Sequence, residues 1–100
     1  MAQLLIMYKR PPDAEAFERY YFDTHVPIFA KAPGIESVMF SRSPITTITG
    51  QSDVYLIAEV TFASMQTLQT ALASEAGRAA VADLPNFAGA GVTILAFESR

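Results

Sequence analysis

Two segments near the ends of the chain predict strands with apolar residues on both faces. In Gln3–Tyr8, Leu4 and Ile6 point to one side while Leu5 and Met7 point to the other, and Ala90–Phe97 is likewise apolar on both sides. Successive side chains of a strand point to opposite faces of the sheet. A sheet that contains these two strands therefore needs cover on both of its faces.

The rest of the chain predicts helices for only one of those faces. Asp13 is a suitable N-cap for a first helix, which Pro27 should end or kink near His25. Two further strands are expected over Ile35–Arg42 and Val54–Phe62, and the latter alternates most clearly. The first helix has one apolar stripe, made of Phe17, Tyr20, Tyr21, Thr24 and Ile28.

A second helical region should begin after Ser64, run through Met65, Leu68 and Leu72, and stop at Pro85. Ser74 and Gly77 predict a break within it. The order strand, helix, strand, strand, helix, strand predicts an α+β, ferredoxin-like fold. Both helices then cover one face of a four-stranded antiparallel sheet. The length of 100 residues fits a single domain over residues 1–100.

The second face of the sheet, which no helix of this chain covers, indicates a partner subunit. No element of this chain is left to cover it, so the simplest cover is a second copy packed sheet on sheet, which makes a homodimer. The alternative is an apolar face left exposed, and monomers rarely carry large patches of that kind.

Composition excludes several classes of function. The net charge of −3 argues against a nucleic-acid partner, which requires clustered Lys and Arg. The chain has no cysteine and one histidine, and its carboxylates show no ligand spacing, so we expect no metal site. No phosphate-binding loop occurs, and we expect no cofactor. The apolar run Leu4–Tyr8 is too short for a signal peptide or a membrane span, so we expect a cytoplasmic location and no membrane association.

His25 is the candidate catalytic residue. On an α-helix it lies roughly 60–80° from the centre of the apolar stripe, at the boundary of the core. Phe22 and Phe29 lie further round the same flank, where two rings would partly desolvate the imidazole and favour its neutral, basic form. The structural alternative is that His25, just before Pro27, caps carbonyls at a helix end.

Phe22 and Phe29 are candidates for contacting a ligand, and other side chains are candidates for orienting it. Tyr8 and Tyr55 carry hydroxyls on predicted strands, and one arrangement points both away from the helices. Glu59 shares a predicted strand face with Tyr55 and could act as an acid or base if that face is covered. The structural alternative for Glu59 is an ion pair with Arg42 or Arg78 between subunits.

The segment Tyr20–Ile35 resembles the EthD family. It combines an aromatic-rich first helix, a His25-Val26-Pro27 step and a Pro33-Gly34 turn that leads into the second strand. The resemblance implies the dimeric α/β-barrel superfamily, in which two ferredoxin-like domains join their sheets. Relatives in that superfamily include cofactor-independent monooxygenases, muconolactone isomerases, polyketide cyclases and haem-binding proteins. The resemblance also implies a link to ether-degrading monooxygenase systems, in which EthD itself looks like an accessory component.

Two functional hypotheses follow. The first is a small cofactor-free enzyme that acts on a hydrophobic metabolite, with isomerase, cyclase or monooxygenase-type chemistry in ether or aromatic-compound degradation. His25 would then be the acid or base, and Tyr8, Tyr55 and Glu59 would orient the ligand. The second is a non-catalytic dimer that binds a small ligand or supports a partner oxygenase. The pocket is expected either around the covered sheet or between that sheet and the Phe22–Phe29 helix end.

Overall fold

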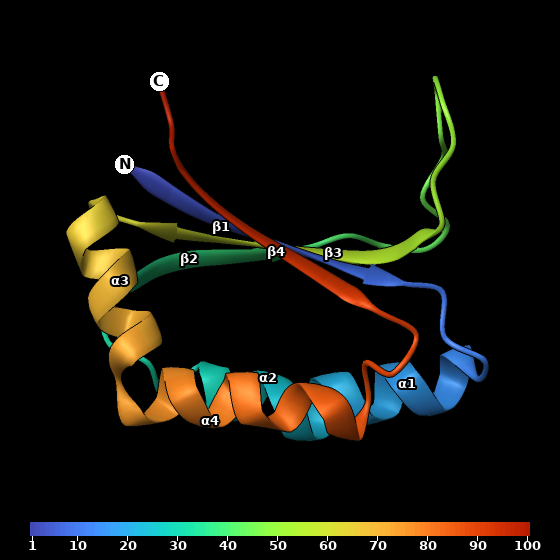
Figure 1. Cartoon of the computed structure of the whole chain (residues 1–100), viewed down its shortest axis with the longest axis horizontal. Coiled ribbons are helices and arrows are strands. Elements are labelled where there is room, and N and C mark those ends of the chain that lie inside the picture. Colours follow the sequence, from blue (N-terminus) through green and yellow to red (C-terminus); the bar gives the residue numbers. More distant parts are fainter.

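A four-stranded antiparallel sheet with helices on one side forms the molecule (Figure 1). The computed structural model describes residues 1–100. Its strands are β1 (Ala2–Lys9), β2 (Ile35–Phe40), β3 (Val54–Phe62) and β4 (Val92–Glu98), in the spatial order β2-β3-β1-β4. Its helices are α1 (Ala14–Tyr20), α2 (Val26–Phe29), α3 (Met65–Ala73) and α4 (Glu75–Asp83). The predicted α+β, ferredoxin-like fold is confirmed.

The helices and the long loop lie on opposite sides of the sheet. In Figure 1, α1, α2 and α4 run below the sheet and α3 descends to them at one end. The loop between β2 and β3, residues 41–53, rises on the other side, and its Ile48 is 88% exposed. No helix is long and apolar enough to cross a membrane.

The side of the sheet that faces the helices holds the core. Leu4 and Ile6 of β1 are buried, and β3 contributes Leu56, Ala58 and Val60. This alternation follows from the two-residue period of a strand. Deeply buried aromatic and aliphatic side chains from the helices, with Phe17 and Leu68 foremost, complete the layer.

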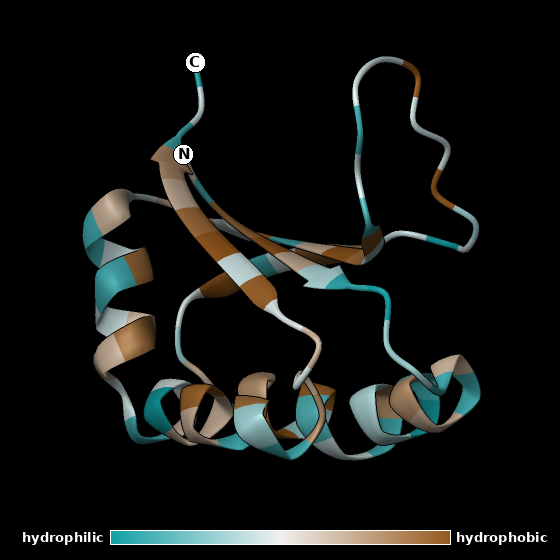
Figure 2. Ribbon diagram, turned by 45° about the vertical axis from the view of Figure 1, so that its right-hand side comes forward, coloured by the Kyte–Doolittle hydropathy of each residue, from teal (hydrophilic) through white to brown (hydrophobic).

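The opposite face of the sheet is open and carries a group of exposed apolar side chains among a few polar ones. Leu95 pairs with Leu5 in the register of β4 and β1, and Phe97 lies two residues further along β4. Leu95, Phe97 and Met39 are 47%, 42% and 63% exposed. In Figure 2, β4 is coloured as hydrophobic along most of its length, which is the pattern of a strand that is apolar on both faces. The expectation that β1 and β4 are apolar on both faces is therefore confirmed.

The first helix continues beyond Pro27 because the turn before the proline is widened. Residues Tyr21–His25 form a π-helical turn (η1), in which the amide of Val26 donates to the carbonyl of Tyr21. Pro27 has no amide hydrogen and crowds the preceding turn, which explains a break in the ordinary pattern here. A π turn takes more residues than an α turn. His25 consequently lies in line with Tyr21 and is buried, 5% exposed, which corrects its predicted place at the edge of the core.

Ser74 separates α3 from α4, as its sequence predicts. Its backbone is extended (ψ 165°), and its side chain accepts a hydrogen bond from the amide of Gly77, which caps α4. Gly77 is needed because α4 approaches the end of α3 very closely. A Cβ atom at Gly77 would lie 2.1 Å from the carbonyl oxygen of Ala71.

Candidate functional site

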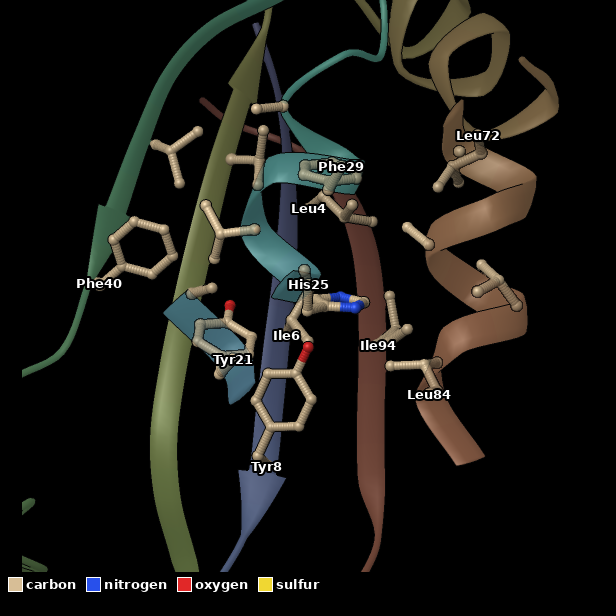
Figure 3. Close-up of a pocket in the computed structure, with 18 residues that line it drawn as sticks. Leu4, Ile6, Tyr8, Tyr21, His25, Phe29, Phe40, Leu72, Leu84 and Ile94 are labelled. Carbon is tan, nitrogen blue, oxygen red and sulfur yellow. The ribbon is translucent and has the colours of Figure 1, made fainter. Parts of the chain in front are cut away.

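A cavity lies between the sheet and the helices. Its volume is about 120 Å³, and sixteen of its eighteen lining residues are hydrophobic. All four strands contribute, together with α2 and α4 (Figure 3). Val38, Val81 and Ile94 line it and are also 39%, 52% and 40% exposed, so the cavity reaches the surface beside them. A concave, mostly apolar site with few polar groups is typical of small-molecule binding.

His25 lines this cavity and is held by Asp83. The Nδ1 atom of His25 lies 2.9 Å from Oδ2 of Asp83, and both residues are buried. A carboxylate accepts hydrogen bonds only, so Nδ1 carries the proton when the imidazole is neutral. The other ring nitrogen, Nε2, makes no hydrogen bond within the chain and has a free lone pair in this tautomer. His25 is therefore oriented so that Nε2 could act as a general base.

Asp83 is itself fixed by three donors. Its Oδ1 accepts hydrogen bonds from the Tyr20 hydroxyl at 2.7 Å and from Nδ2 of Asn86 at 2.9 Å, while Oδ2 faces His25. Burial raises the pKa of Asp83, but the hydrogen bonds from Tyr20, Asn86 and His25 outweigh it and hold the pKa below the ordinary 3.8. The carboxylate therefore stays charged at neutral pH.

The structure gives no helix-capping role to His25. The chain remains helical through Phe29, and the imidazole contacts Asp83 instead of helix-end carbonyls. The rings next to it are those of Tyr21, with centroids 5.6 Å apart, and Phe87, at 4.5 Å. These two rings bracket the imidazole in place of the expected Phe22 and Phe29.

Tyr8 faces the helices and lines the cavity. Its side chain is 1% exposed, and its hydroxyl has no hydrogen-bond partner. Burial raises its pKa far above the ordinary value of 10.0, with a smaller contribution from the nearby Tyr21 hydroxyl. Burial also raises the pKa of Tyr21 to about 12. Both phenols remain protonated, and Figure 3 shows the Tyr8 oxygen on the side of His25 and the Tyr21 oxygen pointing elsewhere among the lining side chains.

Of the other predicted ligand contacts, one lines the cavity and the rest lie outside it. Phe29 lines the cavity, whereas Phe22 is 40% exposed and packs against Phe40 outside it. Glu59 lies on the open face of the sheet, opposite Leu5, and makes no ion pair within the chain. The cavity and Glu59 are therefore on different sides of the sheet.

Tyr55 is displaced by an irregularity in the sheet. The β1–β3 pairing shifts so that Tyr8 faces Leu56 and Lys9 faces Val54, which leaves Tyr55 as the extra residue of a bulge. Its ring turns to the helix side and meets Phe17 edge-on at 5.9 Å, and its hydroxyl donates to Glu18. Tyr55 therefore does not share a face with Glu59, and it does not line the cavity.

The sequence interpretation missed Asp83 and Asn86 and favoured core packing over a hydroxyl contact for Tyr20. One signal was available, because Asp83 is the last residue of α4 and a carboxylate at a helix C-terminus opposes the helix dipole. A residue at such an unfavourable place usually has specific partners. No group of three or more His, Cys, Asp or Glu side chains is arranged to hold a metal ion.

The fold and the apolar cavity define the class of protein, a ferredoxin-like α+β domain of the kind found in dimeric α/β barrels. The EthD domain model matches residues 9–91. A crystal structure of an EthD family protein from Bacillus halodurans superposes with a TM-score of 0.89 at 32% identity, over 100% of this chain and 99% of that one. The chain belongs to the EthD family.

Two further relatives are informative. An uncharacterized 11.0 kDa protein of the thcB-thcC intergenic region of Rhodococcus erythropolis is 33% identical over 96 residues, which is 95% of this chain and 91% of that protein. The fold also matches SnoaB from Streptomyces nogalater, a cofactor-independent oxygenase, with a TM-score of 0.69 at 16% identity. That match covers 99% of this chain and 92% of that one.

Proposed function

We propose that this protein is a cofactor-free acid–base enzyme that binds a small hydrophobic molecule in the cavity and moves a proton with His25. One observation carries the proposal: the only histidine of the chain lines an apolar cavity while a buried carboxylate holds its Nδ1 atom at 2.9 Å. This arrangement leaves Nε2 free to accept a proton, and general bases of this kind accelerate reactions by about 10²–10⁴-fold.

The surroundings of His25 favour such a step. Asp83 fixes the tautomer and stabilises the imidazolium that forms when Nε2 takes a proton. The hydrophobic lining lowers the local dielectric constant, which strengthens electrostatic interactions inside the cavity. The fold that this chain shares with SnoaB, a cofactor-independent oxygenase, supports the proposal that it acts without a cofactor.

We also propose that the working unit is a homodimer that joins the open faces of two sheets. Met39, Leu95 and Phe97 expose apolar surface there, and no helix of this chain covers it. The loop of residues 41–53 rises on the same side, where it would flank a second subunit. Each cavity lies on the other side of its own sheet, so a dimer of this kind leaves both cavities accessible.

Proton exchange tests the catalytic part of this proposal. The protein is incubated in deuterium oxide with a panel of small uncharged compounds that carry weakly acidic C–H bonds, and deuterium uptake is followed by NMR. We expect exchange above the buffer rate for at least one compound, and loss of that acceleration in His25→Asn. Asparagine retains hydrogen-bonding groups but cannot carry the proton.

The competing interpretation is a ligand-binding or accessory dimer. The bond between His25 and Asp83 also ties the first helix to α4, so a purely structural histidine would give the same geometry. That interpretation predicts a lower melting temperature for His25→Asn and no exchange by the wild-type protein with any compound that binds in the cavity. The second result would overturn the catalytic proposal.

A further inference from the structure

The hydroxyl of Tyr8 is the one buried side-chain oxygen or nitrogen that makes no hydrogen bond of good geometry, although the Tyr21 hydroxyl lies close enough to affect its pKa. A buried polar group without a partner is costly, because it has lost its contact with water. Neighbouring rings of Phe17, Tyr21 and Phe87 hold the tyrosine in place, with centroids 5.1–5.6 Å away. A phenylalanine would satisfy the same packing without that cost, so packing does not explain the hydroxyl.

We propose that Tyr8 anchors the oxygen of the ligand, and that the ligand is an uncharged carbonyl compound about the size of one six-membered ring. This assignment rests on the proposed function and specifies its substrate class. The hydroxyl would donate a hydrogen bond to the carbonyl oxygen and place the neighbouring C–H bond near His25. The raised pKa of Tyr8 is consistent with a donor that keeps its proton.

The size of the ligand follows from the cavity. Its volume of about 120 Å³ is somewhat below the roughly 150 Å³ of an engineered protein cavity that binds benzene. A single ring or a branched chain of similar bulk fits this space, with polar substituents at the mouth beside Val81 and Ile94.

The absence of charge on the ligand follows from the lining. No Lys or Arg lines the cavity, and His25, which already faces Asp83, is its only residue with a basic side chain. A carboxylate or phosphate would lose its hydration there without gaining a counter-ion. An uncharged carbonyl loses much less and regains its hydrogen bond from Tyr8.

The two residues then perform complementary parts of one proton transfer. His25 Nε2 takes a proton from the carbon beside the carbonyl, and the electron pair of that C–H bond forms a carbon–carbon double bond. The carbonyl π electrons move to the oxygen, whose developing negative charge Tyr8 stabilises by its hydrogen bond. Return of a proton from His25 to carbon restores the carbonyl, and in deuterium oxide that proton is replaced by a deuteron.

A pair of matched probes tests the anchor by binding alone. Cyclohexanone and methylenecyclohexane have nearly the same shape, and only the first has an oxygen acceptor. NMR titration measures the affinity of each for the wild-type protein, for Tyr8→Phe, and for Tyr55→Phe, which removes a hydroxyl outside the cavity. We expect Tyr8→Phe to weaken cyclohexanone binding by about three- to tenfold, the net effect of one neutral hydrogen bond. Methylenecyclohexane should change by less than about twofold, and Tyr55→Phe should alter neither.

Thermal unfolding supplies a second readout. Because packing does not require the Tyr8 hydroxyl, the melting temperature of Tyr8→Phe should not fall below that of the wild-type protein. Equal affinity of the wild-type protein for the two probes, or equal losses for both in Tyr8→Phe, would overturn the anchor. Either of these binding results says nothing about proton exchange by His25. If instead cyclohexanone binding depends on Tyr8 but the wild-type protein exchanges no proton, the proposed function fails and the anchor stands.

Discussion

The imidazole of His25 and the carboxylate of Asp83 meet at 2.9 Å across 58 positions of sequence. The histidine ends a π turn and the aspartate ends α4, so neither occupies a regular position within an α-helix. Pro27 follows the π turn that carries His25, and Asp83 is held by hydrogen bonds from its neighbour Asn86 and from Tyr20 of the first helix. This pairing orients the one histidine of the chain toward its cavity.

Asp83 is expected to act as a positioning residue. Asparagine at this place no longer requires the proton of His25 to lie on Nδ1, so a fraction of the protein adopts the wrong tautomer. Asp83→Asn should lower kcat for an exchanged substrate by more than about tenfold. Asp83 does not line the cavity, so KM should change by less than about threefold. An unchanged kcat with a raised KM would contradict this role, and Glu75→Gln, at the far end of α4, is the matched control.

Acid should destabilise the protein through Asp83. Its pKa in the folded protein lies below the ordinary value of 3.8, because hydrogen bonds favour the charged form. The resulting stability is present above that ordinary value and is lost as the pH falls through the folded-state pKa. Urea unfolding between about pH 5 and pH 2.5 should show a falling midpoint. The fall should be smaller in Asp83→Asn, and equal slopes in the two proteins would refute the assignment.

Gly77 should not tolerate a methyl group. In an ordinary helix, Gly to Ala stabilises by about 1 kcal/mol. Here the added Cβ would lie 2.1 Å from one backbone oxygen of α3 and 2.8 Å from another. We expect Gly77→Ala to lower the free energy of unfolding by about 2 kcal/mol or more, since backbone atoms cannot move aside cheaply. Gly89→Ala is the control, because nothing lies within 4 Å of its added Cβ. A Gly77→Ala protein as stable as the wild type would show that the contact between α3 and α4 is looser.

The open sheet face should hold two subunits together. Size-exclusion chromatography with light scattering should give twice the mass of one chain at micromolar concentration. Leu95→Glu removes apolar surface from the centre of the proposed interface and adds a second carboxylate to the face that already carries Glu59, so it should give monomers. Ala79→Glu, on the exposed side of α4, should remain dimeric. A monomeric wild-type protein would exclude the sheet-to-sheet dimer.

The sequence was sufficient for the fold because its alternation is regular where the sheet is regular. The predicted strand Val54–Phe62 has the observed bounds, and the break at Ser74 is where its capping chemistry places it. The apolar faces of β1 and β4 were readable from the same two-residue period. These features depend on neighbours within a few positions, which periodicity reports directly.

The site was less accessible to sequence reasoning for two physical reasons. A bulge inserts one residue and reverses the face of Tyr55, and alternation alone cannot show where the register breaks. The π turn likewise moves His25 from the helix flank into the core. Asp83 and Phe87 reach His25 from distant parts of the chain, and no local pattern records such a contact. His25 became a candidate because it is the only histidine of the chain, and Tyr8 because it carries a hydroxyl on a predicted strand.

The most direct test of the role of His25 is the nitrogen NMR spectrum of its imidazole. The chain has one histidine, so a ¹⁵N-labelled sample gives one pair of ring signals. In the neutral imidazole, we predict a protonated Nδ1 and an unprotonated Nε2, because Nδ1 faces the carboxylate of Asp83. Addition of cyclohexanone should then shift the Nε2 signal, because the ligand lies against that atom. A proton on Nε2, or an Nε2 signal that does not respond to a ligand bound in the cavity, would contradict a base at this position.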